Sequence, residues 1–217
     1  MIVREADEEL LEQFYRGLYM SAFAEQREPL EAWQAALAGE APYRFHLRVA
    51  FDGDELVGGV AYEMYPRSRC GFVTYMVVAP AMRGRGLGEQ LQRDAARALY
   101  ADGARAVFSE HNDPRVPHAY ESADVAWQRI RRSARWGNRI VDVRYIQPAL
   151  GPGLERDRGL CLMIKPGEAP LPAAIPGEVV RDFIAELFEV TERTEPDAEL
   201  RELLAGIPDQ VALIEAW

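Results

Sequence analysis

The feature that most constrains this chain is residues 71–88, where an apolar stretch passes through a proline and a glycine-rich loop into an amphipathic segment. Nearly every residue from Gly71 to Val78 is apolar or aromatic, which predicts a strand buried on both faces. After the loop, apolar and charged residues separate at helical spacing. The apolar positions are Leu87, Leu91, Ala95 and Leu99, and the charged ones are Glu89, Arg93, Asp94 and Arg97. The sequence therefore predicts a strand, a loop and a helix in direct succession.

The loop carries glycines where backbone binding of phosphate would need them. Gly84, Gly86 and Gly88 open the predicted helix, so their backbone N–H groups can converge on an anion at its positive end. Arg83 and Arg85 add positive side-chain charge. We interpret this loop as a pyrophosphate-binding site.

The order of these elements resembles the acyl-CoA signature of the GNAT acetyltransferase superfamily, (Gln/Arg)-x-x-Gly-x-(Gly/Ala). Arg83, Gly86 and Gly88 occupy its three positions, and Val78-Ala79-Pro80 precedes them as in that family. The resemblance implies acetyl-CoA as cosubstrate, with its pyrophosphate over Gly84–Glu89 and its pantetheine along Met76–Val78. The residues it implies are Met76, Val77, Val78, Arg83, Gly84, Arg85, Gly86, Leu87, Gly88 and Glu89.

A dinucleotide-binding loop is the rival interpretation of these glycines. That fingerprint is GxGxxG after a first strand, with an acid about 20 residues later. Gly84-x-Gly86-x-Gly88 misplaces the third glycine, and several predicted antiparallel strands precede the loop, although Glu110 falls at a suitable distance. A nucleotide-dependent oxidoreductase is thus a rival hypothesis, which predicts a bound dinucleotide in place of CoA.

The whole chain predicts an α/β (α+β) GNAT fold, with a mixed, mostly antiparallel sheet of about seven strands flanked by helices. Strands are expected at 2–4, 43–51, 56–65, 71–78, from 106, 140–146 and 160–164, and helices at 7–23, 30–37, 87–99 and 123–134. The resemblance covers residues 1–166, which we take as the acetyltransferase domain. Residues 167–217 are predicted to be a proline-rich linker and a C-terminal helical extension that packs on the core or on a second subunit of a homodimer.

Composition narrows the classes of function. A formal charge of −10 over 217 residues argues against a nucleic-acid partner. No stretch reaches transmembrane length and the N-terminus lacks a signal-peptide core, so we expect a cytoplasmic protein without a membrane partner. Cys70 and Cys161 show no metal-ligand spacing, which predicts buried, reduced thiols and no metal site.

Acetylation of an amine needs a base, since a primary amine with a pKa near 10.4 is mostly protonated at pH 7. The predicted central strand has no Glu or His, so the nearest carboxylates by topology are Glu63 and Glu110. We assign the base to Glu110, acting directly or through water, with His111 as its alternate. The spacing of Phe108 to Asn112 resembles the GNAT strand that ends in an asparagine near the pantetheine arm, which adds Asn112 to the implied CoA contacts.

The general acid is less defined by the sequence. Family members commonly carry a tyrosine four residues before a glycine late in the helix after strand five, to protonate the leaving thiolate. Counting back from Gly137 gives Ser133, a departure from that pattern, and Tyr120 is the substitute we consider. Tyr15, Tyr19 and Trp33 can line the acceptor cleft, although core packing is the favoured interpretation for each.

Two further hypotheses follow from the resemblance. The first is an N-acetyltransferase that moves an acetyl group from acetyl-CoA to a small amine by direct transfer in a ternary complex. The alternative is a catalytically degenerate GNAT module that binds acyl-CoA for regulation or assembly, which the missing tyrosine and the helical tail favour. A screen of amine acceptors separates the two.

Overall fold

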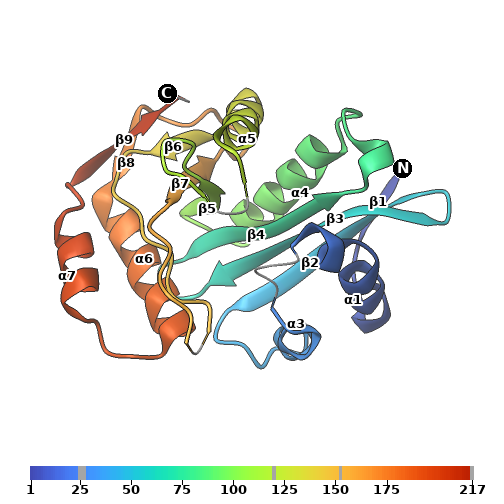
Figure 1. The fold of residues 1–217 in the computed structure, drawn as a ribbon, viewed down its shortest axis with the longest axis horizontal. Helices are drawn as coiled ribbons and strands as arrows, with labels where there is room; N and C mark the ends of the chain where they lie inside the picture. Colours follow the sequence, from blue (N-terminus) through green and yellow to red (C-terminus); the bar gives the residue numbers. More distant parts are fainter. Residues whose placement is uncertain (24–27, 119–120, 152, 216–217) are drawn as a thin grey trace. The chain divides into compact units, whose positions relative to one another are not determined.

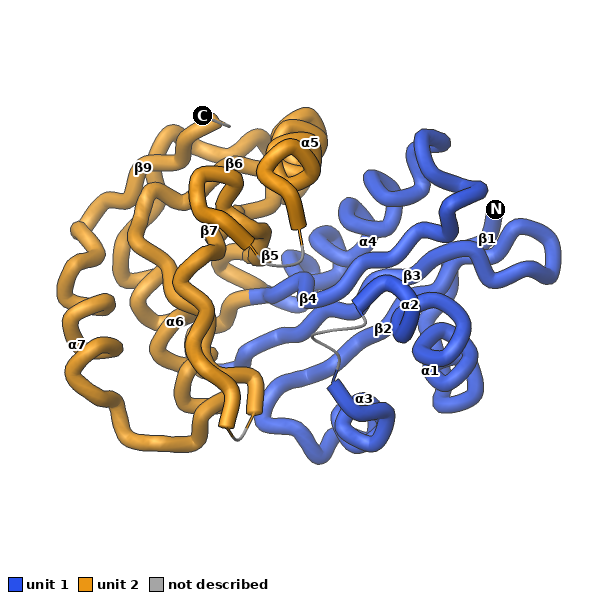
Figure 2. The backbone as a smooth tube through the Cα atoms, in the orientation of Figure 1, with its two compact units in different colours: residues 1–66, 71–103 blue, residues 67–70, 104–217 orange. Residues whose placement is uncertain are grey.

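The computed structural model describes residues 1–23, 28–118, 121–151 and 153–215 (Figure 1). The chain forms two compact units, shown in different colours in Figure 2. Unit 1 comprises Met1–Pro66 and Gly71–Gly103, and unit 2 comprises Arg67–Cys70 and Ala104–Trp217.

The strands of unit 1 are hydrogen-bonded in the order β1-β2-β3-β4. The β1–β2 and β2–β3 pairs are antiparallel, and Asp52 pairs with Glu55 at the predicted hairpin turn. Their bounds are Ile2–Glu5 for β1, Arg44–Asp52 for β2, Glu55–Tyr65 for β3 and Cys70–Val78 for β4.

Helices cover both faces of these strands. Alternate side chains of β2, including Phe45 and Leu47, pack in one apolar cluster with Phe14 and Trp33. Gly58 of β3 instead lies against Leu87 and Leu91 of α4, on the opposite face. The first face carries α1 (Glu8–Phe14), a π-helical turn η1 (Tyr15–Tyr19), α2 (Met20–Ala22) and α3 (Leu30–Leu37), and the second carries α4 (Leu87–Ala101).

The strands of unit 2 are hydrogen-bonded in the order β5-β7-β6-β9-β8, and every pair among them is antiparallel. Because side chains alternate along β5 and β7, the two faces of the sheet bury different partners. Ile130 packs with Cys161 and Met163 on one face, while Phe108 stacks on Phe183 at 4.7 Å on the other. The elements are β5 (Ala106–Asn112), α5 (Ala123–Arg135), β6 (Arg139–Val141), β7 (Leu160–Lys165), β8 (Ala174–Pro176), α6 (Gly177–Glu192), α7 (Ala198–Ala205) and β9 (Gln210–Ile214).

The predicted fold class is confirmed, with two differences in the strands. The described residues form nine strands where the sequence predicted about seven, because the tail contributes β8 and β9 as well as the predicted helices. The strand expected over 140–146 ends at Val141. There the chain turns, with Val143 N bonded to Val141 O at 2.8 Å, and leaves the sheet. The side chains of Tyr145 and Gln147, which follow this turn, form hydrogen bonds with Glu110 instead.

The C-terminal tail packs within unit 2. Ile140 of β6 pairs with Ile214 of β9, so the end of the chain extends the sheet. The buried Glu186 of α6 accepts hydrogen bonds from the backbone of Arg67 at 3.0 Å and of Ser68 at 2.7 Å. These contacts join the tail to earlier parts of the unit. The division into a domain of residues 1–166 and an extension of residues 167–217 stays a prediction.

Candidate active site

Two glycines shape the loop between β4 and α4. After β4 the chain makes one turn of 3-10 helix, η2 (Pro80–Met82), and then passes through Gly84 and Gly86 with φ of +79° and +83°. These left-handed values strain residues that carry a Cβ. Leu87 begins α4 and is buried, which fixes the loop to the core of unit 1.

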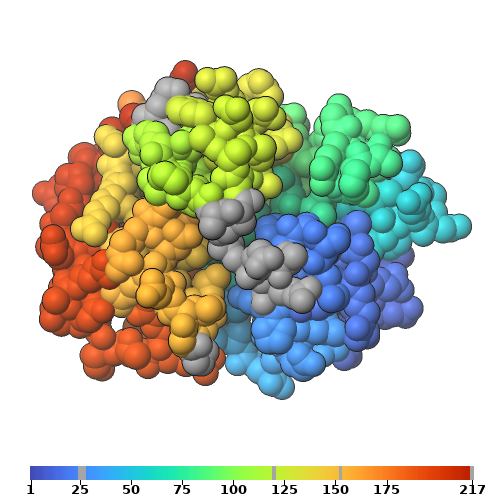
Figure 3. All heavy atoms as spheres, viewed as in Figure 1, coloured from blue at the N-terminus to red at the C-terminus, as the bar shows by residue number. Residues whose placement is uncertain are grey.

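Backbone amides at the start of α4 point to an anion-binding function. The first helical hydrogen bond joins Gln90 N to Gly86 O at 3.0 Å, so the helix itself does not use the amides of residues 87–89. Arg83 and Arg85 are exposed on the same loop, and atoms of this green segment form part of the surface in Figure 3. Amides, helix dipole and two arginines together fit a pyrophosphate.

Beside this turn lies an open hollow of about 370 Å³. Its lining residues are Gly86, Glu89, Gln90, Arg93, Asp94 and Arg97. Glu89 Oε1 accepts a hydrogen bond from Arg93 at 2.5 Å, so its carboxylate is paired with a cation. The group that Glu89 can offer to a phosphate is therefore its backbone amide.

The end of β4, just before the loop, lies close to the backbone of β3. Val77 is buried, and Met76 and Val78 are partly exposed. A Cβ at Gly58 of β3 would lie 2.9 Å from the Val77 carbonyl oxygen, closer than side chains tolerate. Glycine is thus required at position 58 for β3 to approach the segment predicted to hold the pantetheine arm.

In unit 2, Glu110 lies near the end of β5 and is held by two side chains that follow β6. The Tyr145 hydroxyl donates to Glu110 Oε1, and Gln147 Nε2 donates to Oε2 at 2.6 Å. Tyr145 is only 3% exposed, and burial raises its pKa well above the usual value. The phenol therefore keeps its proton and acts as a donor to the carboxylate.

Burial raises the pKa of Glu110 to about 7, because removal from water disfavours the charged carboxylate. The hydrogen bonds from Tyr145 and Gln147 oppose this effect, and the negative charge of Asp157 adds to it. The pKa of this carboxyl is therefore shifted toward neutral pH. A group that titrates there can both accept and return a proton under physiological conditions.

The sequence of residues 5–122 matches the Acetyltransferase (GNAT) family. The matched region is more than half of the 217 residues. The chain belongs to this family. The membership confirms the resemblance carried by Arg83, Gly86 and Gly88.

Solved structures share this GNAT fold. A GNAT-family protein from Bacteroides thetaiotaomicron is 20% identical, with a TM-score of 0.58 over 78% of this chain and 88% of that one. An aminoglycoside 6′-N-acetyltransferase complexed with coenzyme A is 18% identical, with a TM-score of 0.55 over 79% and 99%. A Salmonella typhimurium protein solved with its cofactor acetyl-CoA is 17% identical, with a TM-score of 0.54 over 79% and 97%. A search of curated protein sequences gave no match.

In this GNAT protein the other predicted base, His111, faces away from Glu110. Residues alternate along β5, so His111 shares a face with Ser109, whose Oγ lies 3.3 Å from His111 Nε2. Burial and the nearby charges of Lys165, Arg129 and Arg132 lower the pKa of His111 to about 3. The imidazole is therefore neutral at pH 7 but a very weak base.

Asn112 ends β5 on the same face as Glu110. Its Nδ2 donates to Glu121 Oε2 at 2.8 Å, and Glu121 also pairs with Arg129 at 2.9 Å. The structure thus gives the amide of Asn112 a partner of its own in unit 2.

The candidates for general acid are placed as follows. Ser133, at the position that GNAT proteins commonly give to a tyrosine, is buried and accepts a hydrogen bond from Asn138 Nδ2 at 2.6 Å. Tyr120 lies outside the described residues. Sequence reasoning missed Tyr145, which falls in the strand predicted over 140–146, and Gln147, which begins the loop predicted after that strand. No local pattern links them to Glu110, which is 35 and 37 residues away.

Neither cysteine is suited to act as a nucleophile. Both are free thiols buried in strands, and burial raises the pKa of Cys70 and of Cys161 to about 12. Arginines flank Cys70 in the sequence, and a nearby positive charge lowers the pKa of a thiol. The charge of Arg105 does act in that direction, but the loss of water around the sulfur outweighs it.

The aromatic side chains proposed for the acceptor cleft belong to the core of unit 1. Tyr15, Tyr19 and Trp33 are buried in one apolar cluster. Tyr15 Oη donates to the Glu28 carbonyl at 2.6 Å, and Tyr19 Oη accepts from Glu28 N at 3.0 Å, so both hydroxyls are satisfied by backbone. Core packing therefore accounts for all three residues.

Within the described ranges, no three His, Cys, Asp or Glu side chains gather as ligands for a metal ion. Across the same part of the chain, none of the helices combines the length and apolarity needed to cross a membrane.

Proposed function

We propose that this GNAT-family protein is an N-acetyltransferase that moves an acetyl group from acetyl-CoA to a primary amine of a small molecule. Family membership supports acetyl transfer. Two structures of the same fold contain coenzyme A or acetyl-CoA, which supports the cosubstrate. A cytoplasmic location, a homodimer and the lack of nucleic-acid or membrane partners remain predictions from the sequence.

Acetyl-CoA supplies an acyl thioester, and the residues of unit 1 fit its charged part. In the proposal, the amides of Leu87, Gly88 and Glu89, with Arg83 and Arg85, bind the pyrophosphate around Gly84 and Gly86. The backbone of Met76, Val77 and Val78 runs along the pantetheine arm, and Asn112 contributes from β5. The left-handed glycines and the unused first-turn amides support this assignment.

The chemical half of the proposal rests on Glu110, whose two carboxyl oxygens accept hydrogen bonds from Tyr145 and Gln147 and whose pKa burial raises to about 7. A primary amine loses its proton near pH 10.4, so at pH 7 a base that titrates near neutrality is needed. Glu110 first takes this proton and passes it to solvent, directly or through water, which leaves the nitrogen with a free electron pair. The neutral amine then attacks the thioester carbonyl, and Glu110 takes the second proton that the nitrogen loses as the amide forms and the C–S bond breaks. A thiol has a pKa near 8.5, so protonated Glu110 can also return the proton to the departing thiolate, directly or through water.

Alternative groups are weaker candidates on physical grounds. His111, the alternate base, has a pKa of about 3 and would hold a proton poorly. Tyr120 remains a proposed acid from the sequence. The raised pKa values of Cys70 and Cys161 argue against an acyl-enzyme, because a covalent route needs a reactive thiolate or hydroxyl with an adjacent base.

The test is release of thiol from acetyl-CoA across polyamines, amino acids, aminoglycosides and peptides. With an accepted amine, Glu110→Gln should lower kcat about 100-fold or more at pH 7 and recover partly at high pH, where the amine is already neutral. His111→Gln should lower it far less. Full activity of the Glu110 variant, or acetyl label trapped on Cys70, would contradict the mechanism. Acetyl-CoA binding without turnover of any amine would favour the degenerate binding module instead.

A further inference from the structure

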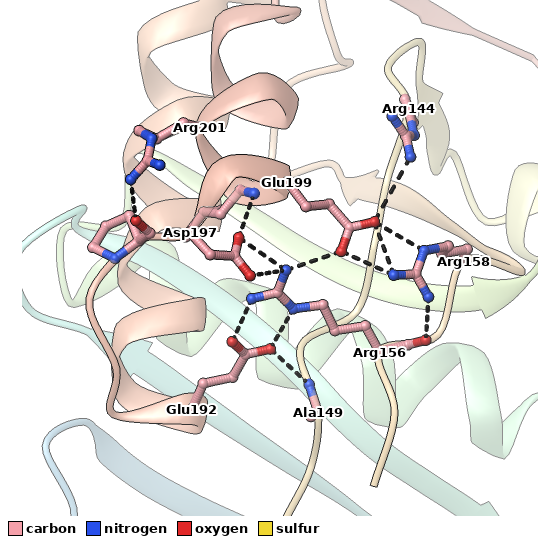
Figure 4. Close-up of polar contacts among 10 residues, drawn as sticks. Arg144, Ala149, Arg156, Arg158, Glu192, Asp197, Glu199 and Arg201 are labelled. Carbon is pink, nitrogen blue, oxygen red and sulfur yellow. Dashed lines mark hydrogen bonds and ion pairs between the residues drawn. The ribbon is translucent and has the colours of Figure 1, made fainter.

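The C-terminal tail binds the segment between β6 and β7 through one arginine, Arg156 (Figure 4). Its Nε and one terminal nitrogen bind both oxygens of Glu192 at 2.7 and 2.6 Å. Its other terminal nitrogen donates to Asp197 at 3.1 Å and to Glu199 at 2.9 Å. Glu192 ends α6, while Asp197 caps α7 and Glu199 lies in its first turn. The guanidinium thus joins one loop to both tail helices.

This contact is more than a surface ion pair. The side chains of Arg156 and Glu192 are each only 12% exposed, and the guanidinium lies 4.9 Å from the centre of the Phe188 ring. The hydrogen bond from Arg156 lowers the pKa of Glu192, which stays ionised. A two-pronged, mostly buried pair of this kind is geometrically specific, and lysine cannot reproduce it.

Neighbouring groups extend the same contact. Glu192 Oε1 also accepts from the backbone of Ala149 at 3.1 Å, so it binds the loop at two points. Arg158 donates to both oxygens of Glu199 at 2.9 Å (Figure 4). Its side chain is 53% exposed, unlike that of Arg156.

The loop held in this way carries the partners of Glu110. Asp157, between the two arginines, pairs its backbone with Gln147 in both directions, at 2.8 and 3.1 Å. The side chain of Gln147 donates to Glu110. A continuous series of contacts therefore runs from α6 and α7 through Arg156 and Asp157 to Gln147 and the carboxylate.

We propose that Arg156 is a positioning residue for Glu110, through which the C-terminal tail keeps Gln147 and Tyr145 on the carboxylate and shields it from water. The importance of this role for catalysis rests on the proposed function, whereas the positioning itself does not. The tail is then part of the catalytic machinery of this chain and not an appendage.

The proposal predicts how Glu110 responds when the loop is released. The groups that act on its titration are the donors Tyr145 and Gln147 and the charge of Asp157. Desolvation is the largest of the effects on Glu110. Loosening the loop admits water, so the pKa should fall toward its ordinary value even though two hydrogen bonds weaken as well.

The experiment is a carboxyl ¹³C NMR titration of the full chain labelled on glutamate, with the Glu110 signal assigned by its loss in Glu110→Gln. We expect Arg156→Met to lower the pKa of Glu110 by about one unit or more. Arg158→Met removes a neighbouring arginine of the same cluster and should change it by much less. An unchanged or higher pKa in the Arg156 variant would overturn the proposal.

A gentler variant keeps the test valid if Arg156→Met folds poorly. Glu192→Gln removes the charge of the partner and leaves the arginine in place, and it should shift the Glu110 titration in the same direction. Faster hydrogen exchange at the Gln147 amide should accompany the shift. A further outcome is that Arg156→Met or Glu192→Gln shifts the pKa of Glu110 while Glu110→Gln keeps full acetyltransferase activity. In that case the positioning role of Arg156 stands and the assignment of Glu110 as the base fails.

Discussion

The cosubstrate loop of unit 1 and the surroundings of Glu110 in unit 2 are built in opposite ways. The loop is one contiguous segment in which backbone amides and two left-handed glycines carry the chemistry, with exposed side chains around them. The Glu110 site is made of side chains from β5 and from the segment after β6, and it depends on exclusion of water. Substitution of the glycines should therefore impair the loop. The Glu110 site should instead respond also to substitutions at residues that do not contact Glu110.

The largest effect expected from this contrast is on stability. The pKa of Glu110 rises from 4.5 to about 7 on folding, so the folded state binds the proton more tightly than the unfolded state. The free energy of unfolding should therefore fall as the pH rises from 4.5 to 7, by on the order of 3 kcal/mol from this group. Glu110→Gln removes this penalty while it removes activity.

Urea denaturation of both proteins at pH 4.5 and pH 8 measures the effect. The stability of Glu110→Gln relative to the parent protein should be higher at pH 8 than at pH 4.5, and any cost of the new amide cancels in the difference. Equal differences at the two pH values would show that the site is not desolvated as described.

A smaller effect is expected at the loop, and a second glycine provides the control. Gly86→Asp places a carboxylate where phosphates are proposed to bind, and acetyl-CoA affinity should fall at least about tenfold, or 1.4 kcal/mol. Gly39, at the end of α3, has the same φ of +83° and equally open space for a Cβ. Gly39→Asp therefore imposes the same backbone strain away from the loop.

Calorimetric titration with acetyl-CoA separates strain from binding. We expect the Gly39 variant to keep the affinity of the parent protein and the Gly86 variant to lose it. Equal affinity in all three proteins would remove the loop from the cosubstrate site.

The two regions also differ in what their sequence reveals. Strand, proline, glycines and helix follow one another within residues 71–88, so the loop and the family could be predicted from one window. Glu110 could be proposed as a base from its position at the end of a strand. Its partners could not. Tyr145 comes from a segment whose apolar pattern predicts a strand but which leaves the sheet after Val141, and Gln147 comes from the loop predicted after that strand, where no local pattern links it to Glu110.

The tail shows the same limit. The spacing of Val180, Ile184 and Leu187 correctly predicted a helix, because amphipathic periodicity is a local signal. The short strands β8 and β9 pair with residues far away in the sequence, as Ile214 does with Ile140, so no local sequence pattern predicts them. The ion pairs of Arg156 were equally hidden, since arginine and acid runs in a sequence are typical of a solvated surface.

The central claim is that Glu110 is a partly buried carboxyl that titrates near neutral pH, and its own titration in the unmodified chain tests this most directly. Carboxyl ¹³C NMR of the folded protein between pH 4 and 9, with the urea-unfolded chain as reference, gives the two pKa values without any need for an acceptor. We expect a midpoint near 7 in the folded state and near 4.5 in the unfolded state. A folded-state midpoint near 4.5 would contradict it.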